Sequence, residues 1–234
     1  MNLITVAGPP SAGKTSLILK AARHLREGGL KVGAVKFDCL SGRDGDRYRA
    51  AGIPVLTGFS GNFCPDHFFV TNIERCVEWG RKQGLDFLVS ESAGLCNRCA
   101  PHIRGFLAVC VLDNLSGIDT PAKVGPMLKT ADLVVVTKGD IVSQAEREVF
   151  AYRVRQVNSR ADIMFADGIT GQGSLEIAMM WREAPSGTPL TGGRLRFSVP
   201  SSVCSYCFGQ TRIGKEFQHG IVREMPIEDL NDAR

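Results

Sequence analysis

Short apolar runs alternate along the chain with segments in which apolar residues recur every three or four positions. The short runs indicate buried strands, and the longer spacing indicates helices with one buried face. The predicted strands cover residues 3–6, 31–37, 85–90, 106–112, 132–137 and 162–166. The predicted helices cover residues 16–26, 70–84, 144–157 and 174–181. This alternation predicts an α/β fold, in which a mostly parallel sheet carries helices on both faces.

The apolar pattern ends near residue 182, and a segment rich in Pro and Gly follows it. Residues 183–193 contain two prolines and three glycines, which is typical of a linker. We therefore predict a main domain over 1–182, a linker over 183–193 and a short Cys-containing extension over 194–234. The extension is too small to build a large core, so we expect it to dock on the main domain or to be held by a metal.

A complete phosphate-binding loop lies between the first predicted strand and the first predicted helix. Its glycines allow the backbone to wrap a triphosphate at the positive end of the helix. We expect Lys14 to contact the β- and γ-phosphates and the Thr15 hydroxyl to hold Mg²⁺. This motif predicts the P-loop NTPase fold. The predicted nucleotide-binding residues here are Gly8, Pro9, Ser11, Ala12, Gly13, Lys14, Thr15 and Ser16.

The strand predicted at 132–137 leads into Thr137-Lys138-Gly139-Asp140, which has the pattern of a guanine-reading element. The Asp140 carboxylate can accept hydrogen bonds from both N1–H and N2–H₂ of guanine. Adenine lacks this donor pair and would leave the carboxylate unpaired. The aliphatic part of Lys138 can lie along the purine ring. We therefore predict GTP as the nucleotide in preference to ATP.

Two acidic residues follow predicted strands between these motifs. Asp38 follows the strand at 31–37, and Glu91 follows the strand at 85–90, three residues before Gly94. Phosphoryl transfer depends mainly on positioning and on charge neutralisation. We therefore predict that Lys14, Thr15, Asp38 and Glu91 carry the reaction, the last three around Mg²⁺. Gly94 is predicted to lie near the γ-phosphate.

The eight cysteines fall into two groups. Three of them, Cys39, Cys76 and Cys110, lie singly in apolar or helical context and are predicted to be small core residues. The other five lie in predicted loops, and with His67 they suggest metal chemistry. Thiolates and imidazoles suit Ni²⁺, Zn²⁺ or an iron–sulfur cluster. The predicted ligands are Cys64, His67, Cys96, Cys99, Cys204 and Cys207.

One Cys-x-x-Cys pair does not close a tetrahedral metal site. Cys64 and His67 can complete the site of Cys96 and Cys99 within one chain, or a second such pair can do so across a dimer axis. Cys96 comes two residues after Gly94. Ordering of this loop by GTP and Mg²⁺, and its release on hydrolysis, would therefore move the thiolates.

Composition narrows the range of partners. The chain is 44% hydrophobic and 22% charged, with a formal net charge of +4 and no basic cluster interleaved with aromatic residues. We therefore expect no nucleic-acid partner. The apolar runs are too short to span a membrane. The first strand begins at once, so we expect no signal peptide and a cytoplasmic protein whose cysteines are not disulfide-bonded.

These motifs together resemble the accessory GTPases that insert nickel into urease and hydrogenase, within the SIMIBI class of P-loop GTPases. The resemblance covers residues 3–182 and implies a GTP-dependent homodimer. Such a dimer would carry a metal at its interface and deliver it to a client metalloenzyme or its accessory proteins. The matching positions are residues 8–15, Asp38, Thr57-Gly58, Cys64-Pro65, His67, Glu91-Ser92, Gly94, Lys123, Gly125-Pro126, Lys138, Asp140 and residues 170–173.

The chain also departs from this pattern. Asp66 is inserted between Pro65 and His67, and neither the Cys96/Cys99 pair nor the Cys-bearing tail has a counterpart in the urease proteins. An ATP-dependent iron–sulfur protein for reductive activation or electron transfer is therefore the main alternative. Two further alternatives stay open. One is a small-molecule kinase with a lid formed by Arg43, Arg47 and Arg49. The other is a partner-binding switch of negligible turnover.

Overall fold

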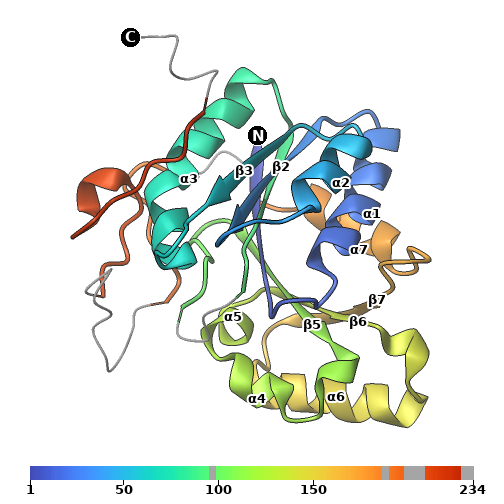
Figure 1. Cartoon of the computed structure of the whole chain (residues 1–234). Coiled ribbons are helices and arrows are strands. Elements are labelled where there is room, and N and C mark those ends of the chain that lie inside the picture. Colours follow the sequence, from blue (N-terminus) through green and yellow to red (C-terminus); the bar gives the residue numbers. More distant parts are fainter. Residues whose placement is uncertain (95–98, 186–189, 198–208, 228–234) are drawn as a thin grey trace.

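The strands form one parallel seven-stranded sheet in the computed structural model, which describes residues 1–94, 99–185, 190–197 and 209–227 (Figure 1). Their order across the sheet is β3-β2-β4-β1-β5-β6-β7. The P-loop NTPase fold predicted from the sequence is therefore confirmed. The strands are β1 (Asn2–Ala7), β2 (Val32–Asp38), β3 (Val55–Phe59), β4 (Phe87–Glu91), β5 (Leu107–Asp113), β6 (Leu133–Thr137) and β7 (Asp162–Ala166).

Helices cover both faces of the sheet because successive strand residues point to opposite sides. Ile4 packs with residues of α1, α2 and α7 on one face, whereas its neighbour Leu3 packs with α3 on the other. The second face also carries α4, α5 and α6 beside β5 and β6. The helices are α1 (Lys14–Glu27), α2 (Asp44–Ala50), α3 (Pro65–Lys82), α4 (Thr120–Val124), α5 (Pro126–Lys129), α6 (Gln144–Val157) and α7 (Ser174–Arg182), with 3₁₀ turns η1 (Asn114–Ser116), η2 (Gly139–Ile141) and η3 (Lys215–Phe217).

The structure corrects the predicted elements in two parts of the chain. β3, α2, α4 and α5 were not predicted, and α3 begins at Pro65 rather than at residue 70. The first turn of α3 starts with proline, a residue that suits the first position of a helix because its missing N–H is not needed there. Cys64 therefore lies in the loop just before the helix, as its N-cap residue, whereas His67 lies in the first helical turn.

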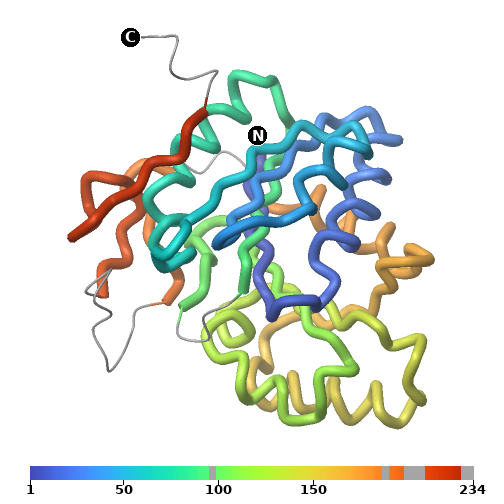
Figure 2. The backbone as a smooth tube through the Cα atoms, viewed as in Figure 1, coloured from blue at the N-terminus to red at the C-terminus, as the bar shows by residue number. Residues whose placement is uncertain are grey.

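The described part of the extension packs against α3, as Figure 2 shows for the red-orange and red segment at the left. Ile213, Met225 and Ile227 are buried there. The Asn72 side chain of α3 accepts a hydrogen bond from the Met225 N–H and donates one to the Arg223 carbonyl. These contacts agree with the expected docking on the main domain. The boundaries at 182 and 193 stay predictions.

Arg196 fixes a second part of the extension beside β5 and β6. Its guanidinium forms two hydrogen bonds of 2.6 Å with the Asp132 carboxylate and donates another to the Phe106 carbonyl. A bidentate pair of this kind is geometrically specific.

None of the described helices has the length and apolar character needed to cross a membrane.

Candidate nucleotide-binding site

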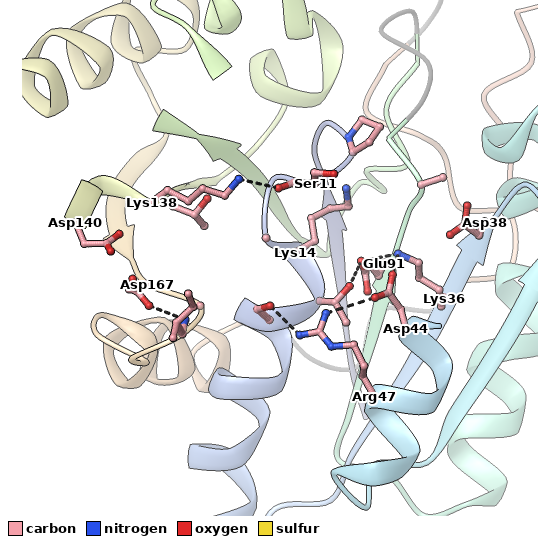
Figure 3. A pocket seen from close by; sticks show the side chains of 18 of the residues that line it. Ser11, Lys14, Lys36, Asp38, Asp44, Arg47, Glu91, Lys138, Asp140 and Asp167 are labelled. Carbon is pink, nitrogen blue, oxygen red and sulfur yellow. Dashed lines mark hydrogen bonds and ion pairs between the residues drawn. The ribbon is translucent and has the colours of Figure 1, made fainter. Parts of the chain in front are cut away.

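A cleft of about 590 Å³ lies where the strands end, as expected for a ligand site on a parallel sheet (Figure 3). It brings together the phosphate-loop region and the guanine-reading element, which are far apart in the sequence. Nine of the predicted site residues line it: Ser11, Gly13, Lys14, Thr15, Ser16, Asp38, Glu91, Lys138 and Asp140. The remaining predicted loop residues, Gly8, Pro9 and Ala12, belong to the same loop.

The loop is held close to the neighbouring strands by two glycines. A side-chain carbon at Gly8 would lie 2.1 Å from the Val111 carbonyl oxygen of β5. A side-chain carbon at Gly94 would lie 1.7 Å from the Gly8 carbonyl oxygen, and Gly94 has a φ of +70°. No larger residue fits these positions without a backbone shift. The loop after β4 and the phosphate loop are therefore in direct backbone contact.

Lys14 begins α1 and turns back over the loop. Its Nζ donates to the carbonyl oxygens of Gly8 at 2.9 Å and Pro9 at 2.8 Å. Burial lowers the pKa of the Lys14 ammonium to about 8, although Glu91 acts in the opposite direction. Gly13 is the N-cap residue of α1 and has no side chain, so phosphate can approach the first N–H groups of the helix.

Glu91 is the centre of a buried polar cluster at this end of the cleft, which we call the phosphate end. The Thr15 hydroxyl donates to Glu91 Oε1 at 2.8 Å, and the Tyr48 hydroxyl donates to Oε2 at 2.7 Å. Lys36 Nζ lies 2.7 Å from Glu91 Oε1 and 3.0 Å from Asp44 Oδ2. Glu91 is 1% exposed. Its charge is therefore balanced within the protein rather than by water.

The charged groups of this cluster shift one another's pKa values. Burial lowers the pKa of Lys36, but Glu91 and Asp44 outweigh burial and raise it above the usual value. Partial burial raises the pKa of Asp44, but the hydrogen bond and charge of Lys36, with Thr15 and Arg47, together outweigh burial and lower it. Burial and the adjacent Glu91 carboxylate raise the pKa of Tyr48 well above 10. Lys36 and Asp44 are therefore charged and Tyr48 is neutral near pH 7.

Sequence reasoning missed Lys36, Asp44 and Tyr48. A signal existed for Lys36, since a lysine inside an otherwise apolar strand is seldom buried without a partner. Asp44 and Tyr48 gave none, because α2 itself was not predicted.

The Asp38 carboxylate lines the cleft and accepts a hydrogen bond from the Cys39 N–H at 2.8 Å. Its predicted role at Mg²⁺ stays a prediction, whereas Asp44 is linked to Glu91 through Lys36.

Lys138 and Asp140 form the other end of the cleft, which we call the base end. Lys138 Nζ pairs with the Asp113 carboxylate and donates to the Ser11 carbonyl at 3.2 Å. This contact joins the base end to the phosphate loop. Asp140 lies in η2, with an exposed side chain that lines the cleft. The position fits its predicted role of accepting hydrogen bonds from guanine.

Asp167 is a further acidic residue at the base end that sequence reasoning missed. It follows β7, lines the cleft and accepts hydrogen bonds from the N–H groups of Ile169 and Thr170. The Thr170 N–H bond, with the Ile169 bond adding to it, lowers the pKa of the Asp167 carboxyl. These bonds shape the turn that contains residues 170–173, which are among the positions of the family resemblance.

The predicted thiol ligands are only partly within the described residues. Cys64 is the N-cap residue of α3, His67 lies buried in its first turn, and Cys99 is half-buried. Burial, with His219 nearby, lowers the pKa of His67. Cys96, Cys204 and Cys207 lie outside the described residues. Over the described ranges, no three or more His, Cys, Asp or Glu side chains are grouped so that they could hold a metal ion.

The other buried sulfur and imidazole groups have structural roles. Cys76 and Cys110 are buried, and burial raises the pKa of each thiol to about 12, as expected for inert core residues. Cys39 is only partly buried, so the core interpretation was wrong for it. His102 is hydrogen-bonded to the Thr5 hydroxyl and to the Met127 carbonyl, which gives it a structural role.

This fold and cleft define a P-loop nucleotide-binding protein. The phosphate loop, the helix that follows it, and the acidic end of β4 occupy the positions that such proteins require. More specifically, the chain belongs to the CobW/HypB/UreG family, because residues 2–165 match that family's nucleotide-binding domain.

Comparisons with individual proteins agree with this assignment. An uncharacterised protein of Methanocaldococcus jannaschii is 47% identical over 225 residues, which cover 96% of each chain. The urease accessory protein UreG of Natronomonas pharaonis is 28% identical over 70% of this chain and 86% of its own length. UreG 2 of Bradyrhizobium is 27% identical over 59% of this chain and 69% of its own length.

Two solved structures share the fold. The hydrogenase maturation factor HypB of Archaeoglobus fulgidus superposes with a TM-score of 0.62 at 24% identity, over 78% of this chain and 89% of its own. HypB of Helicobacter pylori, solved in complex with nickel, gives a TM-score of 0.63 at 20% identity, over 81% of this chain and 91% of its own. At these identities, the likeness concerns the fold alone.

Proposed function

We propose that the protein hydrolyses GTP and thereby controls delivery of a bound metal to a client metalloenzyme or its accessory proteins. The metal is Ni²⁺, Zn²⁺ or an iron–sulfur cluster. The observation that carries the proposal is the backbone contact between Gly94 and the phosphate loop, only two residues before Cys96. The names of the UreG and HypB relatives, urease accessory protein and hydrogenase maturation factor, support this class of function.

The phosphate end has the groups that hydrolysis of a triphosphate requires. Lys14 and the beginning of α1 supply positive charge and N–H donors to the phosphates. The hydroxyl of Thr15 and the carboxylates of Glu91 and Asp44 are oxygen ligands of the kind that Mg²⁺ prefers, so these residues would hold it. Bound there, Mg²⁺ would neutralise charge on the phosphate oxygens.

The base end supports GTP over ATP. Asp140 lines the same cleft. The adjacent Lys138 pairs with Asp113 and also contacts the phosphate loop through the Ser11 carbonyl. A carboxylate placed for two guanine donors gains nothing from adenine. Asp140 thus argues against the ATP-dependent iron–sulfur alternative.

Nucleotide and metal are coupled in this proposal through Gly94. The terminal phosphate binds beside Gly8, so any movement of the phosphate loop meets the backbone of residue 94. Cys96 and Cys99 follow directly in the sequence. We propose that a homodimer shares the thiolates across its axis, where two copies together complete a metal site.

The test compares the parent protein with Cys96→Ala/Cys99→Ala, purified without oxygen. We expect the parent to bind GTP in preference to ATP and to form a dimer with GTP and one metal site. The double variant should bind GTP normally but lose the metal. Cys39→Ala is the matched control, since it changes a partly buried thiol elsewhere and should keep the metal.

The same samples distinguish the alternatives. A brown protein with broad visible absorbance indicates an iron–sulfur cluster, whereas a colourless protein with one divalent ion indicates metal delivery. Metal affinity that is the same with GTP, GDP and no nucleotide would refute the coupling. Equal affinity for ATP and GTP would refute the guanine assignment.

A further inference from the structure

Lys36 is a buried cation at the phosphate end for which the proposed function gives no role. It lies on β2 directly opposite Glu91 on β4, and both side chains point toward the beginning of α1. Its side chain is 6% exposed. Apart from Lys36, all residues from Val32 to Phe37 in this strand are small or apolar. A charge at this position therefore requires a specific partner.

The partners of Lys36 are oxygens suited to a divalent cation. Its Nζ lies 2.7 Å from Glu91 Oε1, the oxygen that also accepts the Thr15 hydroxyl, and 3.0 Å from Asp44 Oδ2. These three residues supply the hydroxyl and carboxylates assigned above to Mg²⁺. Two cations on one carboxylate oxygen repel each other strongly in a buried site. Lys36 and Mg²⁺ therefore compete for the same place.

We propose that Lys36 is a built-in cation that holds Glu91 and Asp44 together until Mg²⁺ enters with the nucleotide, and that it then pairs with the terminal phosphate. This inference rests on the proposed function, because it needs a triphosphate in the cleft. Once displaced, a buried ammonium must find another anion. Lys36 lines the same cleft as Lys14 and Thr15, so the terminal phosphate is the anion within reach of its flexible stem.

The two halves of the proposal have different consequences. While Lys36 bridges the carboxylates, Mg²⁺ alone should bind poorly, because it must first displace a paired charge. When GTP is bound, Lys36 donates a charge-assisted hydrogen bond to the terminal phosphate. GDP lacks this phosphate and cannot accept the bond. Lys36 is thus a positioning residue for the carboxylates and a contact that distinguishes GTP from GDP.

The first experiment measures thermal unfolding of the full chain with and without millimolar MgCl₂, in the absence of nucleotide. We expect the Tm of the parent to stay nearly constant and that of Lys36→Met to rise by roughly several degrees, because the competing cation is gone. Lys31→Met, an exposed lysine just before the same strand, is the matched control and should behave like the parent. An equal Mg²⁺ response in parent and Lys36→Met, or none in Lys36→Met, overturns the competition.

The second experiment compares the affinities for GDP and for a non-hydrolysable GTP analogue, both with Mg²⁺. We expect Lys36→Met to lose roughly tenfold or more of the preference for the triphosphate, with GDP affinity retained. Lys36→Arg keeps a cation and should retain most of the preference. An unchanged preference in Lys36→Met overturns the phosphate contact.

Two further outcomes are decisive. If Lys36→Met folds only when Mg²⁺ is present, the competition is supported directly; if it folds in neither condition, Lys36→Gln takes its place, with the same expected Mg²⁺ response. If the parent binds no guanine nucleotide, the proposed function fails, while the Mg²⁺ response of the two proteins still decides whether Lys36 occupies the cation position.

Discussion

The two ends of the cleft are both built from charged side chains, but they differ in their exposure to water. At the phosphate end, Glu91 is 1% exposed and its partner Lys36 is 6% exposed. At the base end, the Lys138 side chain is 36% exposed and Asp140 is exposed. Electrostatic interactions are strong in the first environment and screened in the second.

This difference separates stability from selectivity. A charge removed from the phosphate end leaves another charge buried without its partner, so the fold itself should suffer. A charge removed from the base end returns its partner to water at little cost. The phosphate end should therefore determine both stability and phosphate binding, whereas the base end should determine only which nucleotide is bound.

The largest effect is expected from Glu91→Gln. The amide keeps the shape but leaves Lys36 with only Asp44 as a charged partner, so the free energy of unfolding should fall by about 3 kcal/mol. Denaturant unfolding measures this change. Asp46→Asn, which breaks an exposed pair with Arg49 in α2, is the control and should change stability by less than about 0.5 kcal/mol. Equal losses in both variants would show that the burial of Glu91 does not set the cost of removing its charge.

Asp140→Asn should change selectivity and leave stability alone. The amide presents an N–H₂ group to guanine donors, so the preference for GTP over ATP should fall by about 100-fold or more. Competition binding with both nucleotides gives the ratio, and denaturant unfolding of the same variant should match the parent. A destabilised protein with its preference intact would reverse the roles of the two ends.

The pH dependence of nucleotide affinity should report on the phosphate end alone. The pKa of Lys14 in the structure is about 8, and bound phosphates would keep this lysine protonated. Binding above about pH 8 therefore requires uptake of a proton, and affinity should fall there by up to about tenfold per pH unit. Lys14→Arg should flatten this decline between about pH 7 and 9, and Asp140→Asn should retain it.

The smallest effect is expected from Asp113→Asn, which breaks the ion pair with Lys138. Because the lysine is partly exposed, stability should fall by only about 0.5 kcal/mol, as measured by denaturant unfolding.

Tyr48→Phe makes the sharper comparison, since it removes one hydrogen bond from buried Glu91 and should cost about 1–3 kcal/mol. If the two losses were equal, burial would not be the variable that separates the ends.

Much of this protein could be predicted from local sequence. The helix at 144–157 and the strand at 162–166 were predicted with the bounds that the structure shows. The helix has its own apolar spacing and a capping box formed by Ser143 and Glu146, and the strand is a short local run. The phosphate loop was predicted for the same reason: its glycines, Lys14 and Thr15 act through the backbone of one short segment.

Tertiary structure decided what depends on contacts between strands. The short strand β3 contains Thr57 and Gly58, α2 buries only Gly45 and Tyr48, and neither has a periodic apolar pattern. The pairing of Lys36 with Glu91 arises because β2 and β4 are neighbours in the sheet, although 55 residues separate these two positions in the sequence. Local composition dictates which chemical groups the chain carries and which local elements present them. The fold decided which of these groups share a buried, weakly screened site, because that depends on the order of the strands.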